Sequence, residues 1–336
     1  IDDLNVAIVA ARARGESSAD LEDKRNAALA TVAGALGVTF TVADTGAMTV
    51  ATTSGQTLVG AGVHELSFSA AAAMTADTVT DAITIDGRTI DPGSGTLAAL
   101  VTMRDETLPA TQDALDALAA ALIDTLNAVT ATGTAVPAPA SLTGTATVAA
   151  TDALDGSGTL HLAVLDADGA VVGTSDLDLA AYATVGDLVD ALNGIGGLSA
   201  SIDADGHLAI ATTASDTGVA LGGDAVVGSD AASVAASFGF NDLMTGTGAA
   251  DITVRAALLE DAGGLALGSL DDSVTTAGAT ALASGSQTVA QALTEALGAS
   301  RDFSAAGRLS ARSSDLAGYA AAIVSDAAAV ASRADT

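Results

Sequence analysis

Near its end the chain carries apolar residues at strict seven-residue intervals, in a stretch that contains no proline. The large members of this repeat are Leu309, Leu316, Ile323 and Val330, and small residues follow the first three at Ser313, Ala320 and Ala327. A sustained seven-residue repeat is typical of a helix that packs lengthwise against another long helix. The pattern therefore predicts a helix-packing seam, inside helix-forming sequence that starts near residue 288 and has a break near Gly298.

The first 36 residues also follow a helical pattern. Leu4 and Ile8 share one face, a break follows at residues 15–18, and helical spacing resumes until Gly37, which we expect to be the C-cap. Both ends of the chain are helix-like and carry no capping signal. We therefore expect the middle of a longer protein, lacking both terminal segments, whose two ends run together as a coiled coil. In that arrangement the Leu4–Ile8 face is the predicted partner of the C-terminal seam.

Between the two ends the period of the apolar positions changes. A period of two predicts β-hairpins over residues 38–90, with one turn at Asp44. Helical spacing then predicts helices at 96–105 and 110–129, the second entered through Pro109.

A β-rich stretch follows over residues 140–254. Strand pairs are predicted at 158–165 with 170–179 and at 198–203 with 207–212. An Asp-Ala-Asp-Gly turn joins the two strands of each pair.

The predicted fold class is α+β and multidomain. An elongated, coiled-coil-like helical core is formed from both chain ends, and β-rich domains are inserted in it. We assign residues 1–135 and 255–336 to the helical core domain, with its β-hairpins at 38–90. Residues 136–254 are assigned to a β-rich outer insert.

Composition limits the core and the partners. The chain has five Phe, two Tyr and no Trp, so the core must be built from Ala, Val, Leu and Ile. Its net charge of −30 repels nucleic acid and anionic membrane surfaces. The longest uncharged stretch, residues 125–151, contains two prolines and fails as a membrane-spanning helix. The absence of cysteine excludes disulfides, zinc–thiolate sites and thiol catalysis, and it suits an exported protein.

Motifs that could carry chemistry are weak. Asp-Thr-Gly triplets at Asp44 and Asp216 resemble the paired carboxylates of aspartic proteases, but their surroundings differ and a turn explains each. The Asp-Ala-Asp-Gly turns lack the glycine spacing of an EF-hand calcium loop. His64, His161 and His207 lack metal-ligand spacing and are expected on exposed strand faces. We therefore predict no catalytic residues, no metal site and no cofactor, and hence no enzyme.

Three strings stand out in a fixed order. The first string, at 20–60, is DLEDKRNAALATVAGALGVTFTVADTGAMTVATTSGQTLVG. The second string, at 104–134, has an Arg-Asp pair, a Leu-Pro step and a late Asn. FGFNDLMTGTGAADITV covers 238–254. Together they resemble the FlgK family of flagellar hook-associated proteins, and the seam matches that family's C-terminal helix in position. Departures from the family's pattern are Lys24, Asn26, Leu243, Met244 and the missing terminal sequence.

The resemblance implies a structural subunit of the bacterial flagellum, outside the cell, that joins hook to filament as a self-assembling ring. Its implied partners are further copies of itself, the hook protein, the next hook-associated protein and an export chaperone that binds the missing C-terminal segment. Flagellin or a neighbouring hook-associated protein is an alternative. The Asp-rich turns leave open a different class, a secreted calcium-dependent adhesin or surface binding module.

Overall fold

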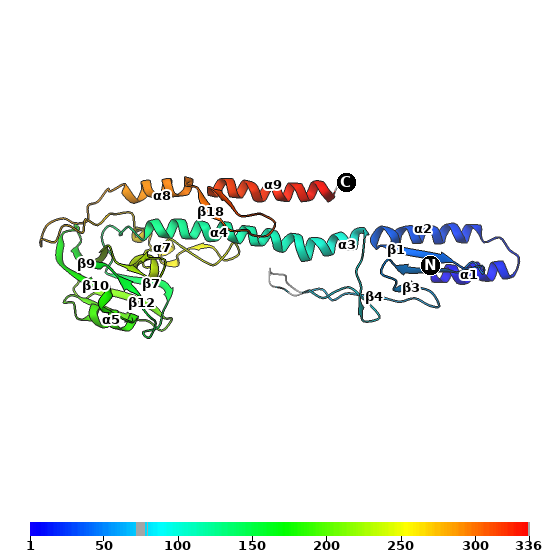
Figure 1. Cartoon of the computed structure of the whole chain (residues 1–336), viewed down its shortest axis with the longest axis horizontal. Coiled ribbons are helices and arrows are strands. Elements are labelled where there is room, and N and C mark those ends of the chain that lie inside the picture. The colour runs from blue at the N-terminus through cyan, green and yellow to red at the C-terminus, as the bar shows by residue number, and fades with distance from the viewer. Residues whose placement is uncertain (72–77, 79, 335–336) are drawn as a thin grey trace. The chain divides into compact units, whose positions relative to one another are not determined.

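The computed structural model of the chain describes residues 1–71, 78 and 80–334. Contacts divide the chain into two compact units, Ile1–Gln112 and Asp113–Thr336 (Figure 1). Both units combine helices with small sheets, so the predicted α+β multidomain class is confirmed. The predicted division by element type, and the coiled-coil-like core from both chain ends, stay predictions.

A helical hairpin opens the first unit. Its helices are α1 (Asp2–Ala13) and α2 (Ala19–Ala35), and the break between them falls where the sequence predicted it. Gly15 has a φ of 71° in this break, a conformation that glycine adopts without strain. The expected C-cap at Gly37 is wrong, because α2 ends at Ala35 and Leu36 is already extended. Gly37 instead permits a close approach, since a Cβ there would lie 2.8 Å from Ser94 Oγ.

Two small antiparallel sheets complete the core of this unit. They have the orders β1-β2-β3 and β4-β5-β6. Their strands are β1 (Val38–Val42), β2 (Met48–Thr52), β3 (Thr57–Val59), β4 (Leu66–Ser67), β5 (Thr84–Ile85) and β6 (Arg88–Thr89). The hairpin predicted around Asp44 is confirmed as β1 and β2. The shared core is aliphatic and consists of Leu29, Leu36, Met48, Val50, Leu58, Val59, Ile83, Ile85 and Ile90.

A long helical run follows β6. It consists of α3 (Gly95–Thr102), a π-helical turn (Met103–Thr107) and α4 (Leu108–Thr130). The two helices predicted here are therefore joined. Pro109 lacks an N–H, and its ring crowds the carbonyl four residues earlier, at Asp105. The wider π turn accommodates that crowding, so the proline perturbs the helix without ending it.

Two three-stranded antiparallel sheets form the β-rich part of the second unit, with the orders β10-β9-β13 and β11-β12-β7. Their strands are β7 (Ser141–Thr147), β9 (Thr159–Asp166), β10 (Val171–Asp178), β11 (Leu198–Ile202), β12 (His207–Thr212) and β13 (Thr217–Gly223). A third small sheet pairs β8 (Gly156–Ser157), β14 (Val226–Val227) and β15 (Ala232–Ser233). Both predicted strand pairs are confirmed, as β9 with β10 and β11 with β12.

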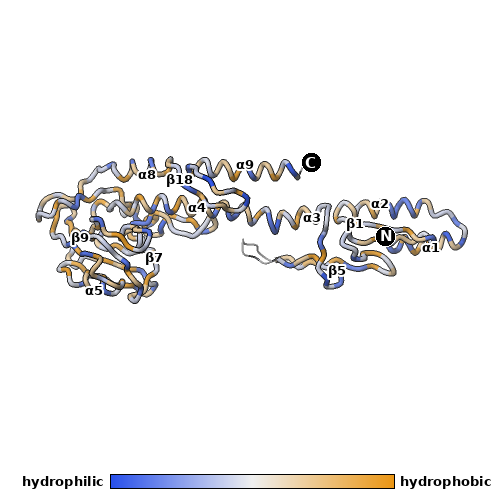
Figure 2. The backbone as a smooth tube through the Cα atoms, viewed as in Figure 1, coloured by the Kyte–Doolittle hydropathy of each residue, from blue (hydrophilic) through white to orange (hydrophobic). Residues whose placement is uncertain are grey.

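Helix α5 (Val185–Asn193) covers the core of these sheets. It begins with a capping box, in which Thr184 and Asp187 satisfy each other's backbone N–H groups. Leu188 and Leu192 on its apolar face pack with Leu160, Leu162 and Leu208. Figure 2 shows apolar positions gathered in this part of the chain. Apart from Phe238 and Phe240, this core is aliphatic, as the composition required.

The second unit ends in short elements and two helices. They are α6 (Val234–Phe238), β16 (Met244–Thr245), β17 (Thr253–Val254), α7 (Ala256–Glu260), α8 (Thr288–Gly298), β18 (Arg301–Phe303), β19 (Arg312–Ser314) and α9 (Leu316–Ala334). Between α7 and α8 the chain crosses one face of the β10-β9-β13 sheet, where Leu270 and Leu282 pack on Leu165. Within the described residues, no helix is both long and apolar enough to cross a membrane.

Candidate functional site

The predicted C-terminal seam is divided between a hairpin and a helix. Leu316 and Ile323 are buried on α9, and Val330 is half-buried on the same helix. Leu309 is buried too, but it lies between β18 and β19, where it pairs with Ala306. The long helix expected from residue 288 is interrupted between α8 and α9, where β18 and β19 form instead, and the break near Gly298 is confirmed.

Local chemistry explains where α9 begins. Gly307 has a φ of 55° in the turn that joins the two short strands, a conformation that favours glycine. Asp315 then precedes the helix, and its Oδ1 accepts a hydrogen bond of 2.7 Å from Gly318 N. An aspartate in this position satisfies one of the free N–H groups of the first turn.

Helix α4 is the element against which these residues pack. Leu309, Leu316 and Ile323 share one apolar cluster with Ala114, and Leu118, Ala121 and Leu122 of α4 pack on it. Figure 1 shows α9 running beside α4. Ala320 is half-buried and Ala327 is exposed, so these two contribute little to the contact.

Two aromatic residues that the seven-residue pattern missed complete the cluster. Tyr319 is fully buried, and its ring stacks on Phe303 with the centroids 3.8 Å apart. Among the described residues, the Tyr319 hydroxyl has no hydrogen-bond partner. Tyr319 lies three residues after Leu316 and four before Ile323, so helical spacing around the repeat could have identified it.

The other half of the predicted seam lies in the first unit. Ile8 is fully buried and Leu4 is half-buried on α1. Between them, the Asn5 side chain donates to Met48 O at 2.7 Å and accepts from Met48 N at 2.9 Å. Buried Arg25 donates to Asn5 Oδ1 and to Gly46 O, which ties α2 to the same strand turn. The pairing of the Leu4–Ile8 face with the C-terminal seam stays a prediction.

Asn127 of α4 fixes the segment that returns from the β-rich part. Its Nδ2 donates to Met244 O at 2.8 Å, and its Oδ1 accepts from Leu243 N and Met244 N, both at 2.9 Å. Asp116 lies about three turns earlier on the same face of α4 and accepts from Ala249 N at 2.7 Å. The second and third strings of the sequence resemblance are therefore in direct contact.

A charged pair lies where this returning segment meets β7. The Arg255 guanidinium donates to Phe240 O at 2.7 Å and also to Thr143 O. Burial raises the pKa of Asp242, although Thr145 donates to that carboxylate at 2.5 Å and Arg255 lies nearby. Burial also lowers the pKa of Arg255. These groups join β7 to the returning segment and suit a structural role.

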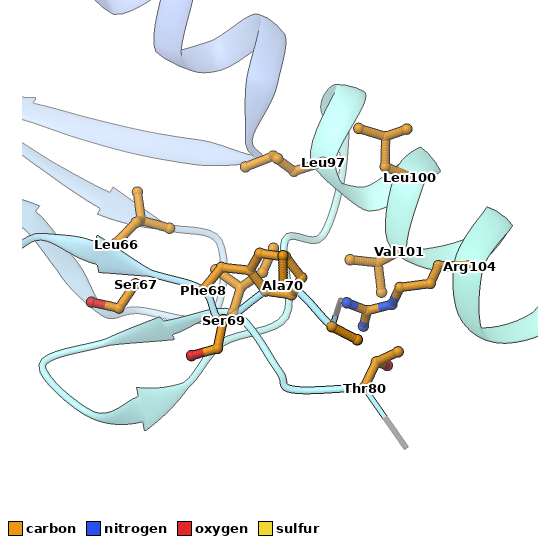
Figure 3. A pocket seen from close by; sticks show the side chains of 12 residues that line it. Leu66, Ser67, Phe68, Ser69, Ala70, Thr80, Leu97, Leu100, Val101 and Arg104 are labelled. Carbon is orange, nitrogen blue, oxygen red and sulfur yellow. The ribbon is translucent and has the colours of Figure 1, made fainter. Parts of the chain in front are cut away.

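A groove of about 530 Å³ lies in the first unit, between the strand segment of β4 and helix α3 (Figure 3). Its walls are mostly apolar, with Leu66, Phe68 and Leu100 substantially exposed. Arg104 lies over the Phe68 ring and donates to Asp105. That hydrogen bond lowers the pKa of Asp105. Among the described residues that line the groove, Arg104 is the one cation, and it is already paired with Asp105.

The turn interpretations of the acidic motifs agree with the structure. Asp44 lies in the β1–β2 turn, and Asp216 precedes β13 with a φ of 60°. The first aspartates of the two Asp-Ala-Asp-Gly turns are Asp166 and Asp203. The Oδ1 atom of each accepts hydrogen bonds from two backbone N–H groups of its own turn. Among the described residues, no group of three or more His, Asp or Glu could hold a metal ion.

The expectation of exposed histidines is wrong for His161. The residue is 6% exposed, and its Nδ1 lies 2.6 Å from Asp176 Oδ1. His161 is on β9, on the sheet face that the chain segment between α7 and α8 crosses. His64 and His207 are half-exposed.

Comparison with known families matches two parts of the chain. Residues 1–141 match the model of the flagellar hook-associated protein FlgK helical domain. Residues 159–214 match the flagellin hook IN motif. The two matches together cover more than half of the chain, while a search of curated proteins gives no match. The chain is a FlgK-like flagellar hook-associated protein, and its role in the flagellum is structural.

Proposed function

We propose that this protein joins the hook of the flagellum to its filament, as one subunit of a self-assembling ring. The match of residues 1–141 to the FlgK helical domain carries this proposal. The family belongs to the flagellum, an extracellular appendage. The more specific position at the hook–filament boundary rests on the order of the three strings in the sequence.

The packing in the second unit supports a mechanical role for the protein. Helix α4 is held to the returning segment by Asn127 and Asp116, and to α9 by the apolar cluster around Tyr319. Three segments far apart in the sequence are thus held together along α4. Hydrogen bonds and apolar packing of this kind resist separation of the segments, which a joint between two tubes requires.

Charge supports an outward position for the β-rich part. Residues 136–254 contain fifteen acidic residues and no lysine or arginine. Such a surface is strongly hydrated and repels its own copies. It is suited to face solvent, whereas contacts between subunits need the helical regions.

The proposed partners are further copies of the chain, the hook protein and the next hook-associated protein. An export chaperone that binds a C-terminal segment is also proposed, from the family resemblance.

Deletion of the gene in its host tests the proposal. The deletion strain should make complete hooks without filaments and release filament subunits into the medium. Reintroduction of the full-length gene should restore filaments and swimming. Normal filaments in the deletion strain would refute a role at the junction.

The flagellin hook IN motif at 159–214 favours a second candidate, a subunit of the filament itself. Mass spectrometry of purified filaments separates the two. A junction subunit should be a trace component, whereas a filament subunit should be the main protein.

A further inference from the structure

Within the described residues, strand β1 has an unpaired outer edge. It lies at the end of the β1-β2-β3 sheet, and the described part of the chain places no strand on its other side. Thr53 N donates to Gly37 O and Ala43 N donates to Ala47 O, so the odd-numbered residues bond towards β2. In an antiparallel ladder the alternate residues then point away. Val38, Phe40 and Val42 therefore present their N–H and C=O groups to the outer edge.

This edge has none of the usual protection. Thr39–Val42 are exposed, with Phe40 at 54% and Val42 at 49%. Residues 37–43 include no charge and no proline, and the pairing of β1 with β2 has no bulge. Proteins normally place lysine, proline or a bulge on an edge strand, because an open edge is a template for another strand.

We infer that β1 pairs with β1 of a second copy, antiparallel, around a two-fold axis at Phe40. The strand sequence Val-Thr-Phe-Thr-Val reads the same in both directions. Antiparallel pairing centred on Phe40 therefore sets Phe40 opposite Phe40, Val38 opposite Val42, and Thr39 opposite Thr41. Aromatic pairs and Thr–Thr pairs are favourable when they face each other across two strands.

The hydrogen-bonding phase agrees with this register. Val38, Phe40 and Val42 point outward in both copies, and this register pairs them with one another. Each such pair exchanges two N–H···O=C bonds, so the contact forms about six. Every outward N–H and C=O group of these three residues therefore meets an outward N–H or C=O group of the other copy.

Charge also favours a second copy at this edge. The nearest charged residue along the strand is Asp44, which would lie opposite Leu36 of the other copy. The two Asp44 side chains would be about 26 Å apart, at 3.3 Å per residue. That separation exceeds the screening length of about 8 Å at physiological salt. Two chains that each carry a net charge of −30 can thus meet here without like charges facing each other along the paired strands.

The contact is two-fold and closes on two copies. It differs in symmetry from the head-to-tail contacts of a ring, so it goes beyond the proposed function and does not depend on it. A five-residue strand pair buries less than the roughly 1,200 Å² of a standard interface. The dimer should therefore be weak, and a covalent trap is the suitable probe.

Single cysteine variants provide that trap, because the chain has no cysteine of its own. Hydrogen-bonded antiparallel pairs have Cα atoms about 5.5 Å apart, within the span of a disulfide. Phe40→Cys of the whole chain, under mild oxidation, should form a disulfide-linked dimer. Thr49→Cys is the matched control, since it is exposed on the adjacent inner strand β2. Dimer formation by Phe40→Cys that is no faster than by Thr49→Cys would overturn the inference.

A mixture of two variants tests the register. Thr39→Cys and Thr41→Cys should cross-link with each other, because the register places them opposite. Thr39→Cys alone should cross-link at least tenfold more slowly, since its own copy lies diagonally, about 8 Å away. Equal rates for the mixture and for Thr39→Cys alone would refute the register.

A charge variant supplies a measurement without cysteine. Phe40→Lys sets two ammonium groups opposite each other and should abolish the concentration-dependent dimer in sedimentation equilibrium. Circular dichroism checks that the variant is folded. A folded Phe40→Lys protein that dimerises as the parent does, or a parent that stays monomeric at millimolar concentration, would contradict the inference.

Discussion

The Asn127 side chain is the polar group that joins α4 to the segment returning from the β-rich part. It makes three hydrogen bonds, one to Met244 O and two from the N–H groups of Leu243 and Met244. Asn127→Ala removes all three. The backbone groups of the returning segment then lose their partners at a half-buried site.

The expected loss follows from the number of bonds. A typical intramolecular hydrogen bond contributes about 1 kcal/mol net, so the variant should lose about 2–3 kcal/mol of unfolding free energy. For a unit of 150–250 residues, 1 kcal/mol moves the melting temperature by roughly 2–4 °C. We therefore expect the second unit to melt about 5–10 °C lower.

Differential scanning calorimetry of the parent and the variant measures this shift. Asp124→Ala is the control, because Asp124 is exposed on the same helix. The control should melt within about 1 °C of the parent, as surface substitutions usually do. If Asn127→Ala also melted within 1 °C of the parent, the returning segment would not be held by this amide and the reasoning would fail.

Three further outcomes are expected. Tyr319→Phe removes a buried hydroxyl that has no partner among the described residues, and it should leave thermal stability unchanged or slightly raised. Tyr319→Ala should cost about 3–5 kcal/mol in denaturant unfolding. Burial raises the pKa of Asp242, so its ionised form lowers the stability of the protein above that pKa. Asp242→Asn should therefore be more stable than the parent at pH 7, and this difference in stability should disappear as pH falls through the raised pKa. A difference that does not depend on pH would contradict this. The melting temperature of the second unit should rise with NaCl from 0.01 to 1 M, as the screening length falls from about 30 to about 3 Å, and a flat response would show that its acidic residues do not repel one another.

Local periodicity was sufficient to predict many elements. The change from helical spacing to alternation located β1 and β2, and turn residues such as Asp166 and Asp203 located two hairpins of the β-rich part. These signals are local, because a strand or a hairpin turn is determined by a few adjacent residues.

Contacts between distant segments could not be predicted in the same way. Leu309 fits the seven-residue repeat, yet it lies in a hairpin and is buried because that hairpin packs on α4. Alternation along β9 sets His161 on the face opposite to Leu160, but no local pattern shows that a later segment covers that face. The same holds for Asn127, whose three partners lie more than a hundred residues away.

Immunogold labelling of intact flagella tests the central proposal most directly. Antibodies raised against the β-rich insert, residues 136–254, would be applied to cells with complete hooks and filaments. We predict gold confined to a narrow band where the hook meets the filament. Gold along the whole filament, or only at its far tip, would contradict a subunit that joins hook to filament.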